Sequence, residues 1–160
     1  MDDREGFAKF YKACRPQVYP VLAVTLGDAR LAQEAVDEAL TRAAERWGEV
    51  REMSRPAGWV YRLGMNWATS WRRKLSLRPT RSAASLDQEH HDLVPDVDLG
   101  IALTGLPMRQ RQMLLMRFGL GYSIDETAAV LDVAPGTVKS GVHRACRQLR
   151  DDREAFDGHP

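Results

Sequence analysis

Apolar residues recur every three or four positions along most of this chain, which is the spacing that places them on one face of an α-helix. These stripes cover residues 7–18, 32–47, 60–71, 110–118 and 124–149. Alternation of apolar and polar residues, which marks a half-buried β-strand, is found nowhere in the sequence. The periodicity therefore predicts an all-α fold.

Proline and glycine divide the stripes into separate helices. Gly27 ends the first stripe, and the Asp28 side chain can cap the helix that follows. Pro16 and Pro20 should start or kink a helix, so the segment before Gly27 is predicted to consist of two pieces. Pro56 suits the first turn of a third helix.

One stretch lacks helical periodicity altogether. Residues 79–95 are rich in serine, aspartate and histidine, which is typical of a linker. The wider stretch 79–104 has one basic residue and five acidic residues. We expect two small helical domains, residues 1–78 and 99–153, joined by a flexible acidic linker over residues 79–98.

The composition limits where such a chain can work. Its 160 residues are 44% hydrophobic and 28% charged, which is ordinary for a globular protein. There is no run of about eighteen apolar residues that could span a membrane, and residues 1–5 are too charged for a secretory signal. Cys14 and Cys146 cannot form a disulfide framework and are expected to be buried thiols. We therefore expect a cytoplasmic protein with no membrane partner.

The formal net charge of +1 is a cancellation between opposed segments. Residues 62–81 hold six basic residues and residues 139–150 hold four, with no acidic residue in either stretch. Residues 28–52, in contrast, hold seven acidic and four basic residues. Two basic stretches suit a nucleic acid, and an acidic stretch suits a basic partner. Ordinary solvated helix faces are the alternative interpretation.

Residues 123–150 carry the most informative motif. Ser123 and Glu126 are predicted to form a capping box at the start of a short helix that ends near Asp132. After a short turn, Pro135 starts a second helix. Helix, tight turn and helix at this length form a helix-turn-helix.

The second helix of this motif has an apolar stripe and a polar face. The stripe consists of Val138, Val142, Ala145 and Leu149. The polar face consists of Thr137, Lys139, Ser140, His143, Arg144 and Arg147. Such donors suit phosphate oxygens and base edges in the major groove of DNA. An exposed basic helix without a ligand looks similar, and this alternative stays open.

The helix-turn-helix region resembles region 4 of bacterial sigma-70 factors, most closely those of the extracytoplasmic-function (ECF) group. The matching segments are residues 106–111, 115–118, 123–131, 135–140 and 143–145. The N-terminal half resembles regions 2.2 to 2.4 of the same family through residues 26–28, 32–43, 56–63, 66 and 71–73. The resemblance covers most of the chain.

The resemblance implies an ECF-type sigma factor, which binds core RNA polymerase, directs it to specific promoters and assists promoter melting. The implied partners are promoter DNA and the β′ clamp helices and β flap of the polymerase. Whether an anti-sigma factor also binds the chain stays open. The alternative is a sigma-like helix-turn-helix regulator or decoy that binds DNA or a protein partner without initiating transcription.

The resemblance also implies roles for individual residues. An acidic face of Glu34, Asp37 and Glu38 would dock on the β′ clamp helices, although a solvated face explains these acids equally well. The minus-ten element would be melted and read by Tyr61, Arg62, Asn66, Arg72, Arg73 and Lys74. The helix after Pro135 would read the minus-thirty-five element. We expect Trp59, Trp67 and Trp71 in the core.

Among the departures from the family pattern, two lie in or next to the recognition helix. Gly141 stands where arginine is common, and we expect it to cost about 1 kcal/mol of helix stability and to remove a DNA contact. Ala134 stands where serine commonly caps the recognition helix, at a cost of about 1 kcal/mol. These departures predict weakened or altered promoter recognition and favour the decoy alternative.

No pattern in the chain predicts catalysis. There is no glycine-rich phosphate loop, nucleophile elbow or pair of catalytic carboxylates. His143 and Cys146 have a spacing that can bind metal, but two ligands make no site. We expect no enzymatic activity, no cofactor, no metal and no small-molecule substrate.

Overall fold

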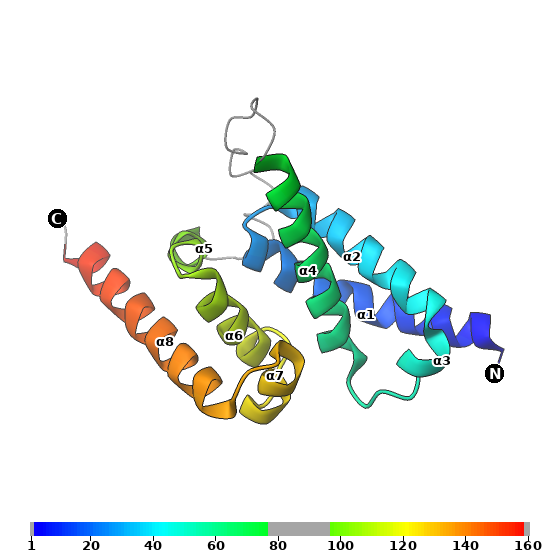
Figure 1. Cartoon of the computed structure of the whole chain (residues 1–160). Helices are drawn as coiled ribbons and strands as arrows, with labels where there is room; N and C mark the ends of the chain where they lie inside the picture. Colours follow the sequence, from blue (N-terminus) through cyan, green and yellow to red (C-terminus); the bar gives the residue numbers. More distant parts are fainter. Residues whose placement is uncertain (1, 77–96, 159–160) are drawn as a thin grey trace.

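The computed structural model of the protein describes residues 2–76 and 97–158, and within those ranges it contains eight helices and no strand (Figure 1). The first four helices are α1 (Asp3–Leu26), α2 (Ala29–Glu45), α3 (Trp47–Val50) and α4 (Pro56–Ser76). The other four are α5 (Val97–Thr104), α6 (Met108–Phe118), α7 (Ile124–Leu131) and α8 (Pro135–Asp157). The predicted all-α fold is confirmed.

The helix α1 runs without a break through both of its prolines, so the predicted division into two pieces is wrong. Proline inside a helix costs roughly 3 kcal/mol because it removes a backbone donor and crowds the preceding turn. The buried face of α1 offsets that cost, because Val18 and Leu22 are fully buried and each such side chain contributes about 1.5–3 kcal/mol. Pro16 itself lies on the exposed side of the helix.

The turn from α1 to α2 forms as the sequence predicts. Gly27 adopts a left-handed conformation with φ of 67°, and its amide donates to the carbonyl of Ala23. The Asp28 carboxylate then accepts a hydrogen bond of 3.0 Å from the Leu31 amide, which caps α2. The predicted cap is confirmed, and it directs α2 back along α1.

The helices α1, α2 and α4 pack around one apolar core. Gly64 of α4 allows close contact, because a Cβ atom there would lie 3.0 Å from a methyl group of Leu22. At the far end of α1, Phe7 and Phe10 pack around the ring of Trp47, with centroids 5.5 and 5.3 Å away. The first contact places α4 directly against α1, and the aromatic contacts place α3 against the start of α1.

The four C-terminal helices also pack against α1. Figure 1 shows α6 and α7 lying between α8 and the group α1–α4. Met116, Leu120 and Tyr122 belong to the same buried cluster as residues of α1, α2 and α4. A second cluster joins Val24 of α1 to apolar residues of α5, α6 and α8. Within the described ranges, therefore, the two groups of helices share a core.

A buried arginine ties the two groups together through backbone carbonyls. Arg111 of α6 is 8% exposed, and its guanidinium donates to the carbonyls of Thr25, Thr104 and Leu106 at 2.6, 2.8 and 2.9 Å. Burial lowers the pKa of Arg111 from its ordinary value. The C-terminal end of α1 is thus fixed against α6. In the part of the chain described, no helix combines the length and hydropathy needed to cross a membrane.

Candidate nucleic-acid interface

The helices α7 and α8 form the helix-turn-helix that the sequence predicts. The Ser123 side chain accepts from the Glu126 amide, and the Glu126 carboxylate accepts from the Ser123 amide, both at 3.0 Å. The predicted capping box is therefore confirmed. Asp132 ends α7 in a left-handed conformation with φ of 54°, where its amide donates to the Ala128 carbonyl.

The helix α8 presents one buried stripe and one exposed face. Val138 and Ala145 are fully buried, and Val142 and Leu149 pack beside them. The six polar residues singled out in the sequence are all exposed: Thr137, Lys139, Ser140, His143, Arg144 and Arg147. All six lie on the exposed side of α8, within a stretch, residues 137–147, that has no acidic residue.

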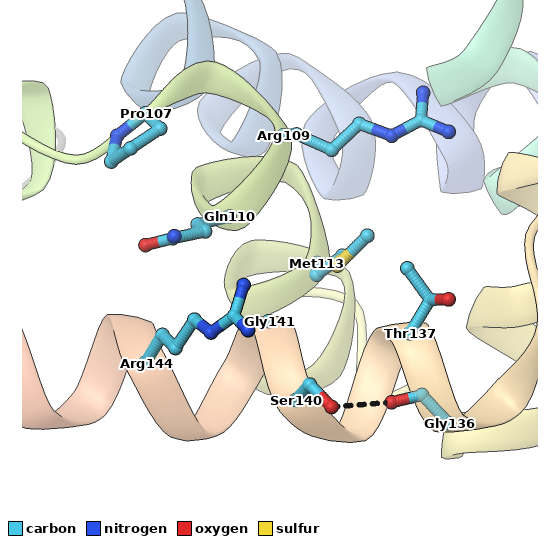
Figure 2. Close-up of a pocket in the computed structure, with 9 residues that line it drawn as sticks. All are labelled: Pro107, Arg109, Gln110, Met113, Gly136, Thr137, Ser140, Gly141 and Arg144. Carbon is cyan, nitrogen blue, oxygen red and sulfur yellow. Dashed lines mark hydrogen bonds between the residues drawn. The ribbon is translucent and has the colours of Figure 1, made fainter.

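A hollow of about 420 Å³ lies between this surface and the start of α6. Figure 2 shows Met113 and Arg109 of α6 across from Thr137, Ser140 and Arg144 of α8. The Ser140 hydroxyl donates to the Gly136 carbonyl at 2.9 Å, so its lone pairs are left to accept from a ligand. Two arginines and two hydroxyl groups at the rim make the hollow suited to anionic groups.

Gly141 lies on the buried side of α8, so the expectation that residue 141 faces DNA is wrong. A Cβ atom at this position would lie 2.4 Å from the Met113 sulfur. The absence of a side chain is what allows α6 and α8 to approach each other here. Gly141 is thus explained by packing, and it removes no side chain from the exposed face.

The helix α4 exposes most of the basic residues predicted to contact the minus-ten element. Arg62, Asn66, Arg73 and Lys74 are exposed. Arg72 is half-buried, and its guanidinium donates to the Leu26 carbonyl at the end of α1. Arg72 therefore has a structural partner, whereas the other four side chains extend from the surface.

Tyr61 does not lie where a base could reach it. Its ring is 0% exposed, and its hydroxyl is 2.9 Å from the Thr25 hydroxyl. Burial raises the pKa of the Tyr61 phenol far above its ordinary value, so the group stays neutral. The physical reason is the position of the core stripe on α4, which runs through Tyr61, Met65 and Ala68.

Known proteins share both halves of this architecture. Residues 98–149, which include the helix-turn-helix, match the family model for region 4 of sigma-70. The chain is 34% identical over 133 residues to the RNA polymerase sigma-E factor of Streptomyces avermitilis, a match that covers 79% of this chain and 73% of the relative. The chain belongs to the ECF group of the sigma-70 family.

Two further proteins are similar to this chain, one in sequence and one in fold. The ECF RNA polymerase sigma factor SigM of Mycobacterium tuberculosis is 29% identical over 153 residues, which cover 92% of this chain and 76% of the relative. The sigma factor RpoE of Bartonella quintana, solved in complex with the anti-sigma factor NepR, superposes with a TM-score of 0.76 at 21% identity. That superposition covers 94% of this chain and 98% of RpoE, and it shows the shared fold.

The acidic face of the sigma factor lies on α2. Glu34 and Asp37 are exposed and Glu38 is half-buried. Arginines compensate two of these charges: Arg15 of α1 is 3.1 Å from Asp37, and Arg42 is 3.4 Å from Glu38. Glu34 makes no salt bridge with another described residue. The structure thus brings the three acids together on one helix, partly neutralised by neighbours.

Two tryptophans of α4 form a surface that the sequence did not predict. Trp59 and Trp67 pack partly buried against the core as expected. Trp71, however, is 42% exposed, so the expectation that it lies in the core is wrong. Its ring is parallel to that of Trp67. The only signal in the sequence was the spacing of four residues between these two tryptophans among basic side chains.

The loop before α4 contacts the start of α7 in this sigma factor. Arg55 lies with its guanidinium carbon 3.8 Å from the centre of the Tyr122 ring. Its Nη1 atom is 3.0 Å from the Glu126 carboxylate, and its Nη2 atom donates to the Leu120 carbonyl at 3.1 Å. These contacts hold the helix-turn-helix against the N-terminal helices.

The two cysteines are both free thiols but differ in burial. No group of three or more His, Cys, Asp or Glu residues among those described could hold a metal ion. Cys14 is buried as expected, and burial raises the pKa of its thiol to about 11. Cys146 is half-buried and free. Cys14 is therefore a neutral thiol at physiological pH, which is the less reactive form.

Proposed function

We propose that this ECF sigma factor binds core RNA polymerase, directs it to specific promoters and assists promoter melting during transcription initiation. The observation that carries the proposal is the exposed polar face of α8 within residues 137–147, a stretch with no acidic residue, held on a capped helix-turn-helix. The proposal assigns no enzymatic activity and no cofactor to the chain, and it places the protein's work in the cytoplasm, where the polymerase is found.

The face of α8 is proposed to read the minus-thirty-five element. Arginine and lysine there supply contacts to phosphates, and hydroxyl or imidazole groups supply contacts to base edges. The proposed residues are Thr137, Lys139, Ser140, His143, Arg144 and Arg147. The hollow beside Arg144 leaves space for a phosphate between α6 and α8.

The exposed side of α4 is proposed to bind the minus-ten element. Arg62, Asn66 and Arg73 follow one stripe of the helix by their spacing, and Lys74 lies beside it. Tyr61 is left out of this group because it is enclosed, and Arg72 is left out because it binds a carbonyl of α1. Exposed cations and an amide suit the backbone and base edges of a separated strand.

The acidic face of α2 is proposed to dock on the β′ clamp helices of the polymerase, and the C-terminal helices on its β flap. Glu34, Asp37 and Glu38 would meet basic residues of the partner. Arg15 and Arg42 would have to release their carboxylates for this, because each already forms an ion pair in the free chain.

The two halves are proposed to be working domains, residues 1–78 and 99–153, that separate on a promoter. The minus-ten and minus-thirty-five elements are about 25 base pairs, or roughly 85 Å, apart along the DNA. While Arg55 contacts Glu126, the two binding surfaces cannot be that far apart. The chain from Asn66 to Arg55, the contact with Glu126 and the chain from Glu126 to Arg144 add up to less than about 70 Å, even when they are laid end to end. The contact between the halves must therefore open before both elements can be bound.

Run-off transcription tests the proposal against its rivals. Core polymerase is mixed with the chain and with fragments of the source genome, and the transcripts are sequenced. Specific transcripts are expected from the wild type and are expected to be lost when Glu34, Asp37 and Glu38 are all changed to lysine. Transcripts absent for the wild type would favour a regulator or decoy. Gly141 no longer supports that alternative, because it lies beneath Met113.

A further inference from the structure

Arg55 forms a salt bridge between the two halves of the chain, residues 2–76 and 97–158. Its Nη1 atom lies 3.0 Å from each carboxylate oxygen of Glu126, and its Nη2 atom donates to the Leu120 carbonyl at 3.1 Å. Within those two ranges, no other salt bridge joins the halves. While the halves are in contact, which is called the closed form below, the C-terminal half therefore occupies both terminal nitrogens of Arg55.

Arg55 lies at the start of the polar stripe of α4. It directly precedes Pro56, the first residue of the helix. The exposed residues Arg62, Asn66 and Arg73 follow it after 7, 11 and 18 positions, which are close to two, three and five helical turns. By its spacing, Arg55 thus continues the stripe that is proposed to bind the minus-ten element. Figure 1 shows α7, the helix of Glu126, beside this end of α4.

The carboxylate of Glu126 holds Arg55 in the way that a phosphate would. A guanidinium binds a carboxylate or a phosphate through the same donors, with the same kind of charge-assisted hydrogen bond. The two partners exclude each other here, because both terminal nitrogens of Arg55 already donate to the C-terminal half. An ion pair that is partly exposed contributes little to stability, so its exchange for a phosphate meets little resistance.

The N-terminal half offers Arg55 no equivalent carboxylate on α4. This helix has four basic residues and no acidic one. Glu52, in the loop before α4, is already paired with Arg51 at 3.6 Å. When the halves separate, the capping box of α7 stays in place, because Ser123 and Glu126 both belong to the C-terminal half. The guanidinium of Arg55 is then left for an anion from outside the chain.

We propose that the C-terminal half inhibits strand binding by α4 in the closed form, because Glu126 holds the guanidinium of Arg55 that a phosphate of single-stranded DNA would otherwise bind. When the halves separate, Arg55 exchanges Glu126 for that phosphate and joins the polar stripe of α4. Closure and strand binding therefore oppose each other, and each weakens the other by the same factor. This inhibitory contact rests on the proposed function, since promoter melting supplies the single strand.

Strand binding by Glu126→Gln tests the inhibition. The probe is a fluorescein-labelled oligothymidylate of about 12 nucleotides, mixed with the purified chain and followed by fluorescence anisotropy. Glutamine can still accept from the Ser123 amide, but it no longer holds Arg55 by charge. The variant is expected to bind the strand about 1.5- to 5-fold more tightly, which is the factor that corresponds to one exposed ion pair.

The matched control removes the same charge from the adjacent residue. Asp125 is exposed on the first turn of α7 and makes no salt bridge with another described residue. Asp125→Asn is therefore expected to leave the affinity for the strand unchanged. Binding of a labelled duplex through α8 is measured for every variant, to check that the C-terminal half is folded.

Arg55→Ala tests where the released guanidinium binds. Loss of one phosphate contact with a single strand is expected to lower the slope of log affinity against log salt by about 0.7. In the Arg55→Ala background, Glu126→Gln is expected to give no further gain in affinity, because no guanidinium remains to be released. A gain that persists in this background would show that Glu126 only repels the strand, and it would overturn the exchange.

The other outcomes also separate the inhibitory contact from the proposed function. Strand binding by Glu126→Gln that is no tighter than that of the wild type, the absence of binding by both included, would overturn the inhibition. Equal gains from Glu126→Gln and Asp125→Asn, or an unchanged salt slope in Arg55→Ala, would do the same. If Glu126→Gln does not fold, the salt slope of Arg55→Ala decides alone.

Run-off transcription by the wild type completes the comparison. Promoter-specific transcripts alongside any of the contrary results would leave the sigma function standing without the inhibitory contact. An Arg55-dependent gain in strand affinity with no specific transcript would support the inhibitory contact and overturn the sigma function.

Discussion

The hydroxyl of Tyr122 accepts a hydrogen bond of 2.6 Å from the Gly58 amide at the start of α4. The two residues are 64 positions apart and belong to different halves of the chain. The same hydroxyl donates to the Arg55 carbonyl at 2.8 Å, so one phenol satisfies two backbone groups. The Tyr122 hydroxyl thus joins the helix-turn-helix half of the chain to the start of α4 through two hydrogen bonds.

Gly58→Ala is expected to destabilise the protein by about 1–3 kcal/mol despite the better helix propensity of alanine. The reason is that a Cβ atom at Gly58 would lie 2.5 Å from Cε2 of Tyr122. Urea unfolding measures the effect. Gly48→Ala is the control, because nothing lies within 4 Å of a Cβ there. Equal shifts in the two variants would show that Tyr122 moves away without cost.

Tyr122→Phe is expected to cost about 1–3 kcal/mol in the free energy of unfolding, because it leaves the Gly58 amide and the Arg55 carbonyl without their partner. The loss should also loosen the contact between the halves, which small-angle X-ray scattering would detect as a larger radius of gyration. Tyr11→Phe removes a hydroxyl from an exposed ring and serves as control. An unchanged unfolding midpoint for Tyr122→Phe would mean that water replaces the phenol.

Local signals in the sequence predicted the helices and their caps well. The caps at Asp28 and Ser123 depend on residues within three positions of each other, so their chemistry is readable from the sequence. The course of α1 through Pro16 is different, because the burial that compensates for the proline comes from helices distant in the chain. Local propensity was overridden there by packing.

The sequence predicted only part of the candidate site, because periodicity shows the buried stripe of a helix clearly on α8 and poorly on α4. Periodicity identified the exposed face of α8 correctly, because its apolar stripe is long and regular. On α4 the tryptophans suggested a core stripe, whereas the buried stripe passes through Tyr61. The contact of Gly58 with Tyr122 left no periodic signal, since it depends on how two separate groups of helices meet.

The contribution of Glu126 to stability is expected to depend on pH. Hydrogen bonds from the Ser123 amide, followed by those from Arg55, lower the pKa of the Glu126 carboxyl below its ordinary value of 4.5. A lowered pKa in the folded state means that the charged form stabilises the fold above pH 4.5 and that this contribution is lost as the pH falls below it. Thermal unfolding of the wild type and Glu126→Gln from neutral to acid pH measures this.

The difference in Tm between these two proteins should be present at neutral pH and should shrink below pH 4.5, the ordinary value. Glutamine is a suitable replacement because it keeps the reach of the capping box without the charge. In an Arg55→Ala background the difference in Tm should depend less on pH, because the hydrogen bond from Arg55 that helps to lower the pKa of Glu126 is removed. A difference in Tm that stays constant from neutral to acid pH would contradict the lowered pKa of Glu126.

Gly141→Ala is expected to affect packing between α6 and α8 through Met113. The clash with the Met113 sulfur should cost about 1–3 kcal/mol, partly offset by the gain of about 1 kcal/mol in helix propensity. In a Met113→Ala background, which itself costs about 2–5 kcal/mol, Gly141→Ala should instead be stabilising. A double-mutant cycle by urea unfolding measures this coupling, and an additive result would show that the two residues do not interact.

Arg144→Ala is expected to weaken binding of the sigma factor to promoter duplex and to reduce the salt dependence of that binding. Each phosphate contact that is lost should lower the slope of log affinity against log salt by about 0.9. Fluorescence anisotropy at several salt concentrations gives the slope. Arg153→Ala is the matched control, because Arg153 lies on the same helix beyond the proposed face and pairs with Asp157 at 3.8 Å. Equal slopes for the wild type and Arg144→Ala would show that Arg144 does not contact a phosphate, and the recognition surface would then lie elsewhere. The reason is that each cation that neutralises a phosphate releases counterions from the DNA, so the loss of such a contact always lowers the slope.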